Sequence, residues 1–261
     1  MSARNPRGWP RRRAEELLLA FSLLTRLPVP RLTVRHGVQL PDYLWAFPMV
    51  GFVIGHIAAA AFILARLGGA GSNGAAVLAM AASVLATGAL HEDGLADFWD
   101  GIGGGRTRER KLEIMRDSSI GSYGAVALFL VLAARWSALA GITDLHAGAG
   151  VLVLSHTLSR GLLALVPQFW RPARAEGLAA GTANGNLTSA LAAIGLSLAA
   201  ALVLDAGPFA LLALVAAVVA IIAIAALATR HLGGYTGDVF GAAEQTAEAL
   251  VLMVCAVALG H

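Results

Sequence analysis

Long apolar runs recur along this chain and restrict the folds open to it. Several stretches of predominantly Ala, Leu, Val and Gly occur within the 261 residues. About 20 such residues in a helix cross the roughly 30 Å hydrocarbon core of a bilayer. The composition is 57% hydrophobic and only 13% charged, whereas about 25% of a soluble domain is charged. The sequence therefore predicts an all-α, polytopic integral membrane bundle of about seven transmembrane helices.

The predicted spans are separated by loops of two kinds. Some loops are short, turn-like and nearly free of Lys and Arg, whereas the others carry the basic residues and the polar motifs. The seven spans are drawn at residues 43–65, 75–92, 123–141, 148–167, 187–205, 208–228 and 244–260.

The distribution of basic residues predicts the orientation of the bundle. Eight of the 19 Lys and Arg residues lie in the first 35 positions, and most others lie in three loops, 92–122, 168–186 and 229–243. Cytoplasmic loops carry such an excess, so we expect a cytoplasmic N-terminus and active site in a multi-pass bacterial inner-membrane protein. The net charge of +3 follows this sidedness and does not indicate nucleic-acid binding.

The chain divides into two parts at the sequence level. Residues 1–30 form a basic N-terminal segment, within which residues 15 to about 27 are too short to span and favour an interfacial helix. Residues 31–261 read as a single membrane-embedded catalytic domain. The lone cysteine, Cys255, excludes an intrachain disulfide.

One stretch, from His91 to Gly124, concentrates charge in this apolar chain. If it is helical from Asp93, that residue shares one face with Asp97 and Asp100. Carboxylates held together repel one another unless a cation lies among them, and Mg²⁺ takes carboxylate and phosphate oxygens. These three aspartates are the predicted metal ligands of a phosphoryl-transfer site.

A basic segment follows the acidic one. Arg106, Arg110 and Arg116 precede or flank a further acid, Asp117, among small residues. Such arginines either clamp a diphosphate or only mark the cytoplasmic side. We expect substrate contacts from the three arginines and a catalytic role for Asp117. His91 is either a general base or an interfacial hydrogen-bonding residue, and we expect a catalytic role.

The segment HLGGYTGDVFGA, residues 231–242, interrupts two predicted spans with glycines. Irregular backbone at this depth is tolerated where it is buried or lines a polar cavity. We expect Asp238 to act in catalysis and Gly233, Gly234 and Thr236 to contact substrate. Arg160, inside a predicted span, either binds phosphate or pairs internally with an acid, and substrate binding is the role we expect.

Three motifs together, HEDGLADFWDG, IMRDSSIGSYG and GGYTGDVFGA, with the early LTRLPVP, resemble the cobalamin synthase family. The resemblance runs from about Phe21 to Val254. It implies a Mg²⁺-dependent adenosylcobinamide-GDP ribazoletransferase of the inner membrane. The substrates would be adenosylcobinamide-GDP and α-ribazole or its 5′-phosphate, and GMP would be released in the last steps of cobalamin biosynthesis.

Carried onto this chain, the family's acidic motifs fall on Asp93, Asp97, Asp100, Asp117 and Asp238. Glu92 departs from the family pattern, in which an apolar residue, commonly leucine, is expected. An additional carboxylate there would tune metal affinity. The sequence leaves a monomer and a homo-oligomer both open.

Two rival functions were weighed against this one. A CDP-alcohol phosphotransferase is also a membrane bundle with clustered aspartates and Mg²⁺, but its pattern requires Ala-Arg where this chain has Ala96 and Asp97. A transporter or ion-binding scaffold would place ionisable groups near the membrane midplane, whereas these acids gather at one predicted edge.

Overall fold

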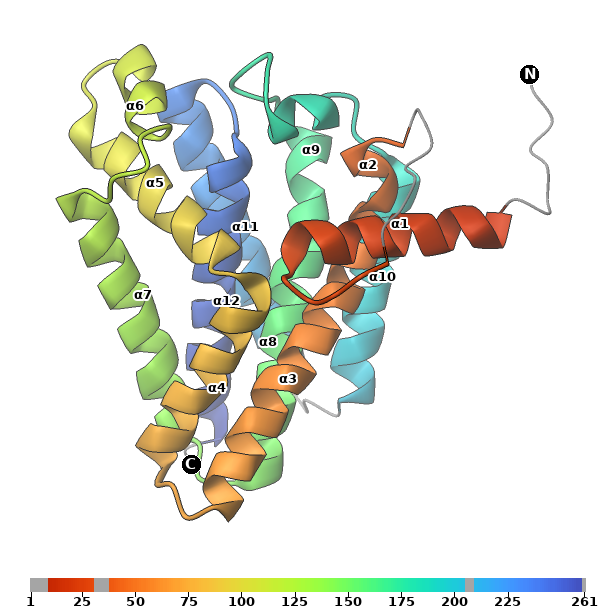
Figure 1. The fold of residues 1–261 in the computed structure, drawn as a ribbon, viewed down its shortest axis with the longest axis vertical. Coiled ribbons are helices and arrows are strands. Elements are labelled where there is room, and N and C mark those ends of the chain that lie inside the picture. The colour runs from red at the N-terminus through yellow and green to blue at the C-terminus, as the bar shows by residue number, and fades with distance from the viewer. Residues whose placement is uncertain (1–8, 31–37, 205–208, 260–261) are drawn as a thin grey trace.

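The computed structural model describes residues 9–30, 38–204 and 209–259, and these fold into a bundle of helices (Figure 1). The α-helices are α1 (Trp9–Leu24), α2 (Leu40–Tyr43), α3 (Phe47–Leu67), α4 (Ser72–Thr87), α5 (Leu90–Gly104), α6 (Arg108–Ile114), α7 (Ser122–Gly141), α8 (Leu145–Leu162), α9 (Val166–Phe169), α10 (Leu187–Val203), α11 (Phe209–Leu232) and α12 (Gly237–Leu259). Short 3-10 turns are η2 (Leu44–Ala46), η3 (Leu163–Leu165) and η4 (Leu178–Thr182). The predicted all-α class is confirmed.

Five of these helical segments are long and apolar enough to cross a membrane. They are Leu40–Leu67, Ser122–Gly141, Leu145–Phe169, Phe209–Leu232 and Gly237–Leu259. The pair α4 and α5 passes the same test together but is bent by 89°, which would give a sixth span, and α10 is a shorter apolar helix. The second predicted segment, 75–92, is broken by the turn at Gly88 and Ala89, whereas the other six are helical over nearly all of their described residues. The number that qualify as spans is five or six.

Helices α3 and α8 form the closest contact of the bundle. A Cβ atom added to Gly51 would lie 2.1 Å from the carbonyl oxygen of His156, and one on Gly55 would lie 2.6 Å from Cα of Val153. Two glycines four residues apart therefore let the backbones touch, as is common between membrane helices. Further along α8, Gly161 meets the side chains of Ser197 on α10 and Pro48 on α3.

The turn between α4 and α5 bends the chain beneath the candidate site. Gly88 and Ala89 both adopt the left-handed conformation, with φ of 69° and 59°. This conformation is unfavourable for alanine, so tertiary contacts must hold it. The backbone N–H of Arg26 donates to the carbonyl of Ala86 at 2.7 Å, which ties the chain after α1 to this turn.

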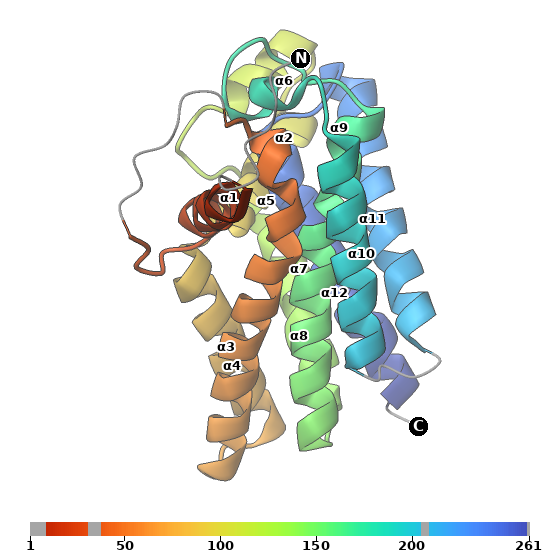
Figure 2. The same cartoon turned by 90° about the vertical axis from the view of Figure 1, so that its right-hand side faces the viewer.

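Helix α1 lies across the bundle rather than along it (Figures 1 and 2). Its Glu16 is fully buried, accepts a hydrogen bond from Trp45 Nε1 at 2.8 Å and pairs with Arg12 and Arg13. The prediction of a short N-terminal helix is correct, although it begins at Trp9 and is anchored through a buried carboxylate.

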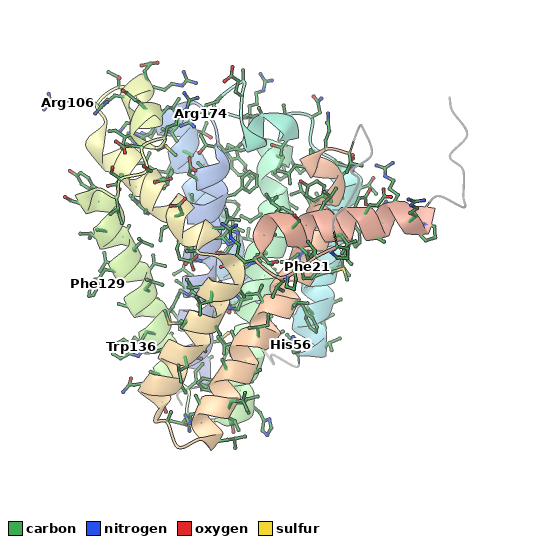
Figure 3. All side chains as sticks on the ribbon, in the orientation of Figure 1. Phe21, His56, Arg106, Phe129, Trp136 and Arg174 are labelled. Atoms are coloured by element: carbon green, nitrogen blue, oxygen red, sulfur yellow. The ribbon has the colours of Figure 1, made fainter. Side chains whose placement is uncertain are left out.

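The two ends of the bundle differ in chemistry. The α5–α6 segment, the chain after α9 and the α11–α12 turn lie at one end, and the α3–α4 and α7–α8 loops lie at the other (Figures 1 and 2). Arg106 and Arg174 mark the first end, whereas Phe129 and Trp136 on α7 are 71% and 40% exposed and point away from the bundle (Figure 3). Apolar side chains of this kind face lipid in a spanning helix.

Candidate active site

The acidic residues of α5 and α12 meet where these two helices cross. A Cβ on Gly94 would lie 3.1 Å from Cα of Asp238, and one on Gly241 would lie 2.9 Å from the carbonyl of His91. The absence of side chains at both positions permits this approach. Helix α12 begins at Gly237, seven residues before the predicted span, so Asp238 is held on its first turn. The two sequence motifs, more than a hundred residues apart, thus form one site.

Negative charge accumulates around Asp97 at this crossing. Its half-buried carboxylate lies within electrostatic range of Asp93, Asp238, Asp100 and Asp117, and all four raise the energy of its ionised form. Asp93 is exposed and Asp238 is partly buried. Repelling oxygen donors on two rigid helices are a set that fits a hard divalent cation such as Mg²⁺.

Asp100 has a different environment from the other two aspartates of α5. It is buried, its Oδ2 accepts the backbone N–H of Gly121 at 2.7 Å, and its Oδ1 accepts that of Gly124 at 2.8 Å. These amides belong to the first turn of α7, which lacks partners within its own helix. Asp100 was expected to bind metal, but in the structure both of its oxygens cap α7.

The glycine-rich segment forms a braced turn between α11 and α12. Gly233 and Gly234 have positive φ values of 75° and 157°, and a side chain on Gly234 would collide with the carbonyl of Arg171. Tyr235 exchanges backbone hydrogen bonds with Arg171 and Ala173 at 3.0 and 2.8 Å. The predicted interruption of the helix is correct, and these two glycines serve the turn's backbone.

Thr236 follows this turn and is buried. Its hydroxyl donates to Asp238 Oδ2 at 3.1 Å. This hydrogen bond orients the carboxylate of Asp238, and the predicted substrate contact of Thr236 stays a prediction.

The predicted arginines lie at the polar end of the bundle in unequal settings. Arg106 and Arg110 are exposed, and Arg110 pairs with Glu113 at 2.7 Å. Arg116 is exposed and lies close enough to Arg174 for the two charges to repel each other. Asp117 is exposed, and the backbone N–H of Ser119 donates to it at 3.0 Å, which lowers its pKa.

Arg174 also lies in this region. The sequence-based prediction includes it only among the basic residues of the 168–186 loop that indicate the orientation of the bundle. Partial burial and the neighbouring Arg116 lower its pKa, while Asp238 acts in the opposite direction. One of its amino groups donates to the carbonyl of Leu112 at 2.6 Å. The arginine therefore lies between the basic segment and the carboxylates. The signal available in the sequence was the position of Arg174 two residues after Pro172 in a polar loop.

A cavity of about 240 Å³ adjoins the acidic residues. It is lined by Leu23, Leu24, Leu40, Phe47, Leu90, His91, Asp93, Gly94, Leu163, Gly237, Asp238, Phe240 and Gly241. His91 is only 3% exposed, and neither of its ring nitrogens has a hydrogen-bond partner. Its Nδ1 lies 3.7 Å from Glu244 Oε2, so the imidazole links the cavity to a deeper set of polar residues.

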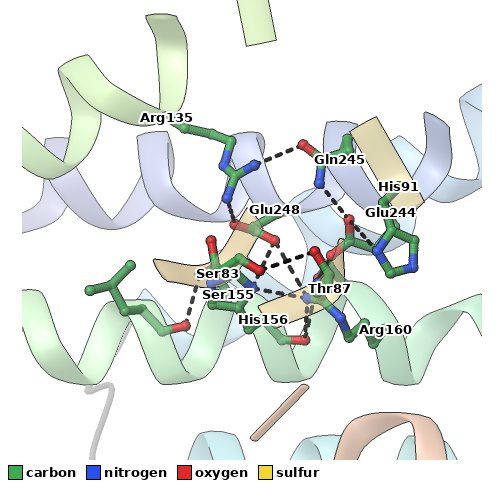
Figure 4. A network of polar contacts seen from close by, with 12 residues as sticks. Ser83, Thr87, His91, Arg135, Ser155, His156, Arg160, Glu244, Gln245 and Glu248 are labelled. Atoms are coloured by element: carbon green, nitrogen blue, oxygen red, sulfur yellow. Dashed lines mark hydrogen bonds and ion pairs between the residues drawn. The ribbon is translucent and has the colours of Figure 1, made fainter. Parts of the chain in front are cut away.

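That deeper set is a buried ionic network among α5, α7, α8 and α12 (Figure 4). Arg160 pairs with Glu244 at 2.7 Å, and Arg135 pairs with Glu248. The other contacts are His156 Nδ1 to Glu248 at 2.9 Å, Ser159 to Glu244 at 2.8 Å, Arg135 to Gln245 at 2.7 Å and Gln245 to Glu92 at 3.1 Å. Burial of charge is tolerated when opposite charges are paired in this way.

The network corrects the prediction for Arg160. Its side chain is 1% exposed and is held by Glu244 and Glu248, so its charge is engaged within the bundle. Internal pairing was the second of the two roles open to it. Glu92, which departs from the family pattern, likewise belongs to this network rather than to the aspartates.

Within the described ranges, one group of three potential ligands has all its donor atoms within 4.8 Å of one another, and it consists of His156, Glu244 and Glu248. Because Arg135 and Arg160 already neutralise these glutamates, the group is better described as part of the scaffold. The aspartates of α5 and α12 are more loosely spaced, and two of them, Asp93 and Asp238, line the cavity.

The chain is similar to known proteins over most of its length. A family model described as cobalamin-5-phosphate synthase matches residues 16–256. The chain is 43% identical to an adenosylcobinamide-GDP ribazoletransferase of Mesorhizobium japonicum over 96% of both chains, and 43% identical to one of Bradyrhizobium diazoefficiens over 92% of this chain and 93% of that one. A Shewanella amazonensis protein of the same name is 41% identical over 94% of this chain and 95% of its own.

No solved structure matches the chain significantly. The family match runs from within α1 to within α12 and includes both halves of the candidate site. Of the two enzyme classes considered for the acidic motif, the match favours the cobalamin synthases over the CDP-alcohol phosphotransferases. The chain belongs to the cobalamin-5-phosphate synthase family.

Proposed function

We propose that this protein is an adenosylcobinamide-GDP ribazoletransferase of the bacterial inner membrane, with its site on the cytoplasmic face. The observation that carries the proposal is the meeting of the α5 and α12 carboxylates beside a cavity at the basic end of the bundle. The reaction joins adenosylcobinamide-GDP to α-ribazole or its 5′-phosphate. It yields adenosylcobalamin or its 5′-phosphate and releases GMP.

The chemistry is a phosphoryl transfer. A ribose hydroxyl attacks the phosphorus bonded to cobinamide, the bond to the GMP phosphate breaks, and the hydroxyl proton is lost. Because the product made from ribazole 5′-phosphate keeps that phosphate, the nucleophile is a ribose hydroxyl other than the 5′ one. His91, with an unpartnered buried imidazole beside the cavity, is our candidate to accept the proton.

Asp93 and Asp97 are the proposed Mg²⁺ ligands, and Asp238 completes the set from α12. A bound Mg²⁺ supplies neutralisation of charge on the diphosphate. Thr236 orients Asp238 through its hydroxyl. Arg116 and Arg174 are the proposed contacts of the departing GMP phosphate, because their charges lie near each other and near Asp238.

The first prediction is tested with purified protein in lipid nanodiscs. Wild-type protein with Mg²⁺ is expected to release GMP from adenosylcobinamide-GDP only when α-ribazole is present. Asp93→Asn and Asp97→Asn are expected to lower the rate by about 10²–10³, the range found when one group that stabilises transition-state charge is removed. Removal of Mg²⁺ with a chelator is expected to stop turnover.

Glu109→Gln is the matched control, because Glu109 is an exposed carboxylate on α6. Its rate is expected to equal that of the wild type. Wild-type turnover that persists without Mg²⁺, or unchanged rates in both aspartate variants, would refute the metal assignment. Release of CMP from a CDP-alcohol in place of GMP would refute the proposed reaction.

A further inference from the structure

The cavity beside the aspartates has two chemically different walls. Leu24, Leu40, Phe47, Leu163 and Phe240 form an apolar wall contributed by α1, α2, α3, η3 and α12. The polar wall presents side chains of α5 and α12, namely His91, Asp93 and Asp238. A ligand that fits must therefore carry an apolar part and a polar part that contact the two walls at once.

The cavity is too small to hold adenosylcobinamide-GDP, and of the acceptor it can enclose only the base and the adjoining ribose. At about 240 Å³ it is smaller than the roughly 300–1,000 Å³ that enclose drug-sized ligands. A corrin ring with its side chains, or a guanosine diphosphate, is too large for it and too polar for its apolar wall. An uncharged two-ring aromatic base is of suitable size and polarity.

We infer that this cavity is the acceptor subsite, in which the apolar base of ribazole lies against the leucine and phenylalanine wall and its ribose hydroxyl faces His91. The inference rests on the proposed function. It assigns the cavity to one of the two substrates, and the larger nucleotide substrate approaches the aspartates from the exposed basic end of the bundle.

The polar wall supports this orientation of the nucleoside. His91 is buried, it lines the cavity, and both of its ring nitrogens lack hydrogen-bond partners. An unpartnered buried polar group is costly, and a ribose hydroxyl beside it supplies the missing partner. The nearest acidic oxygen, Glu244 Oε2, lies 3.7 Å from Nδ1, beyond hydrogen-bond range. The hydroxyl is thereby held next to Asp93, a proposed metal ligand.

Helix α1 forms part of the apolar wall and is fixed in place. Leu23 and Leu24 are at its C-terminal end. Arg26 is bonded through its backbone to Ala86 at 2.7 Å, and Glu16 is held by Trp45 at 2.8 Å. Because the helix is anchored at its middle and just after its C-terminal end, Leu24 has a defined position, and its size limits the base that fits. The N-terminal helix thus contributes to acceptor specificity.

The test changes the volume of the apolar wall and measures each substrate separately. With wild-type turnover established, Leu24→Phe is expected to raise the KM for α-ribazole by about tenfold or more, as steric changes in apolar pockets do, and to leave the KM for adenosylcobinamide-GDP within about twofold. Leu24→Ala enlarges the cavity. It is expected to improve kcat/KM for a riboside with a bulkier three-ring base relative to α-ribazole.

Leu17→Phe is the matched control, because Leu17 is on the same helix but lines a different, apolar cavity with Pro48 and Phe52. Its two KM values are expected to be those of the wild type. Equal increases in both KM values with Leu24→Phe, or unchanged KM values together with unchanged base preference in Leu24→Ala, would overturn the inference. Absence of GMP release by the wild type would instead refute the proposed function.

Discussion

At the scale of single residues, the three aspartates of α5 have distinct roles despite their even spacing. Asp93 is exposed beside the cavity, whereas Asp100 is 6% exposed and accepts two backbone N–H groups of α7. Helical periodicity places these side chains on one face, but the neighbouring helix determines which of them remains free. We therefore expect a substitution at Asp100 to lower stability and a substitution at Asp93 to lower the catalytic rate.

Asp100→Ala is predicted to destabilise the protein by about 1–3 kcal/mol, because the amides of Gly121 and Gly124 lose their acceptor. Asp93→Ala is predicted to change stability by less than about 0.5 kcal/mol, as at exposed positions, and to lose turnover. Thermal unfolding of the two variants in the same detergent measures the difference. An unfolding temperature of Asp100→Ala equal to that of Asp93→Ala would contradict the capping role.

At the scale of elements, the site depends on the close crossing of α5 and α12. Gly94 and Gly241 face each other there, and a methyl group at either position would press on the opposite backbone. Since Asp93 and Asp97 are on one helix and Asp238 is on the other, a change in the separation of the helices changes the distances between the carboxylates.

Gly241→Ala is predicted to destabilise the protein by about 1–3 kcal/mol through overpacking and to reduce GMP release, because a Cβ there would lie 2.9 Å from the carbonyl of His91. Gly195→Ala on α10 is the control, since no atom lies within 4 Å of its added Cβ. A helix interior gains up to about 1 kcal/mol from such a change. Wild-type activity in Gly241→Ala would show that the crossing tolerates separation.

At the scale of the whole molecule, the basic end of the bundle carries the aspartates, the glycine turn and the arginines, and we predict that this end faces the cytoplasm. Cys255, the single cysteine of the sequence, is buried. Labelling by a maleimide therefore reports on an introduced cysteine, with little contribution from Cys255. In inside-out vesicles, Ser118→Cys is expected to react with a membrane-impermeant maleimide and Asn73→Cys is not. Both positions are exposed and lie in or beside loops. The reverse pattern would invert the orientation.

The sequence predicts the helical bundle and much of the site because the signals for them are local. Apolar runs and glycine interruptions are read directly from the chain, and the motifs that contain Asp93, Asp97 and Asp238 carry the family resemblance. The catalytic role expected of Asp238 stays a prediction, and in the structure Gly94 of α5 packs against the backbone of Asp238.

What the sequence does not predict depends on partners far along the chain. The sequence around Arg160 is compatible with phosphate binding, but in the structure Glu244 pairs with it. The spacing of Asp100 is that of a metal ligand, but the amides of Gly121 and Gly124 use its two oxygens as acceptors. The sequence also does not predict the bend at Ala89, because alanine favours a continuous helix. In each case a tertiary contact overrides the local preference.

The buried ionic network has a consequence for how the protein is made. Arg135 precedes its partner Gln245 by 110 residues, and Ser159, next to Arg160, precedes Glu244 by 85. The ribosome therefore completes α7 and α8, each carrying an arginine, long before the neutralising glutamates of α12 exist. A charge at the centre of a membrane helix is costly while it lacks a partner. Final closure of the bundle must wait for the last helix, and a chain that ends before α12 leaves Arg160 without Glu244 and Arg135 with Glu92 alone, at 3.5 Å.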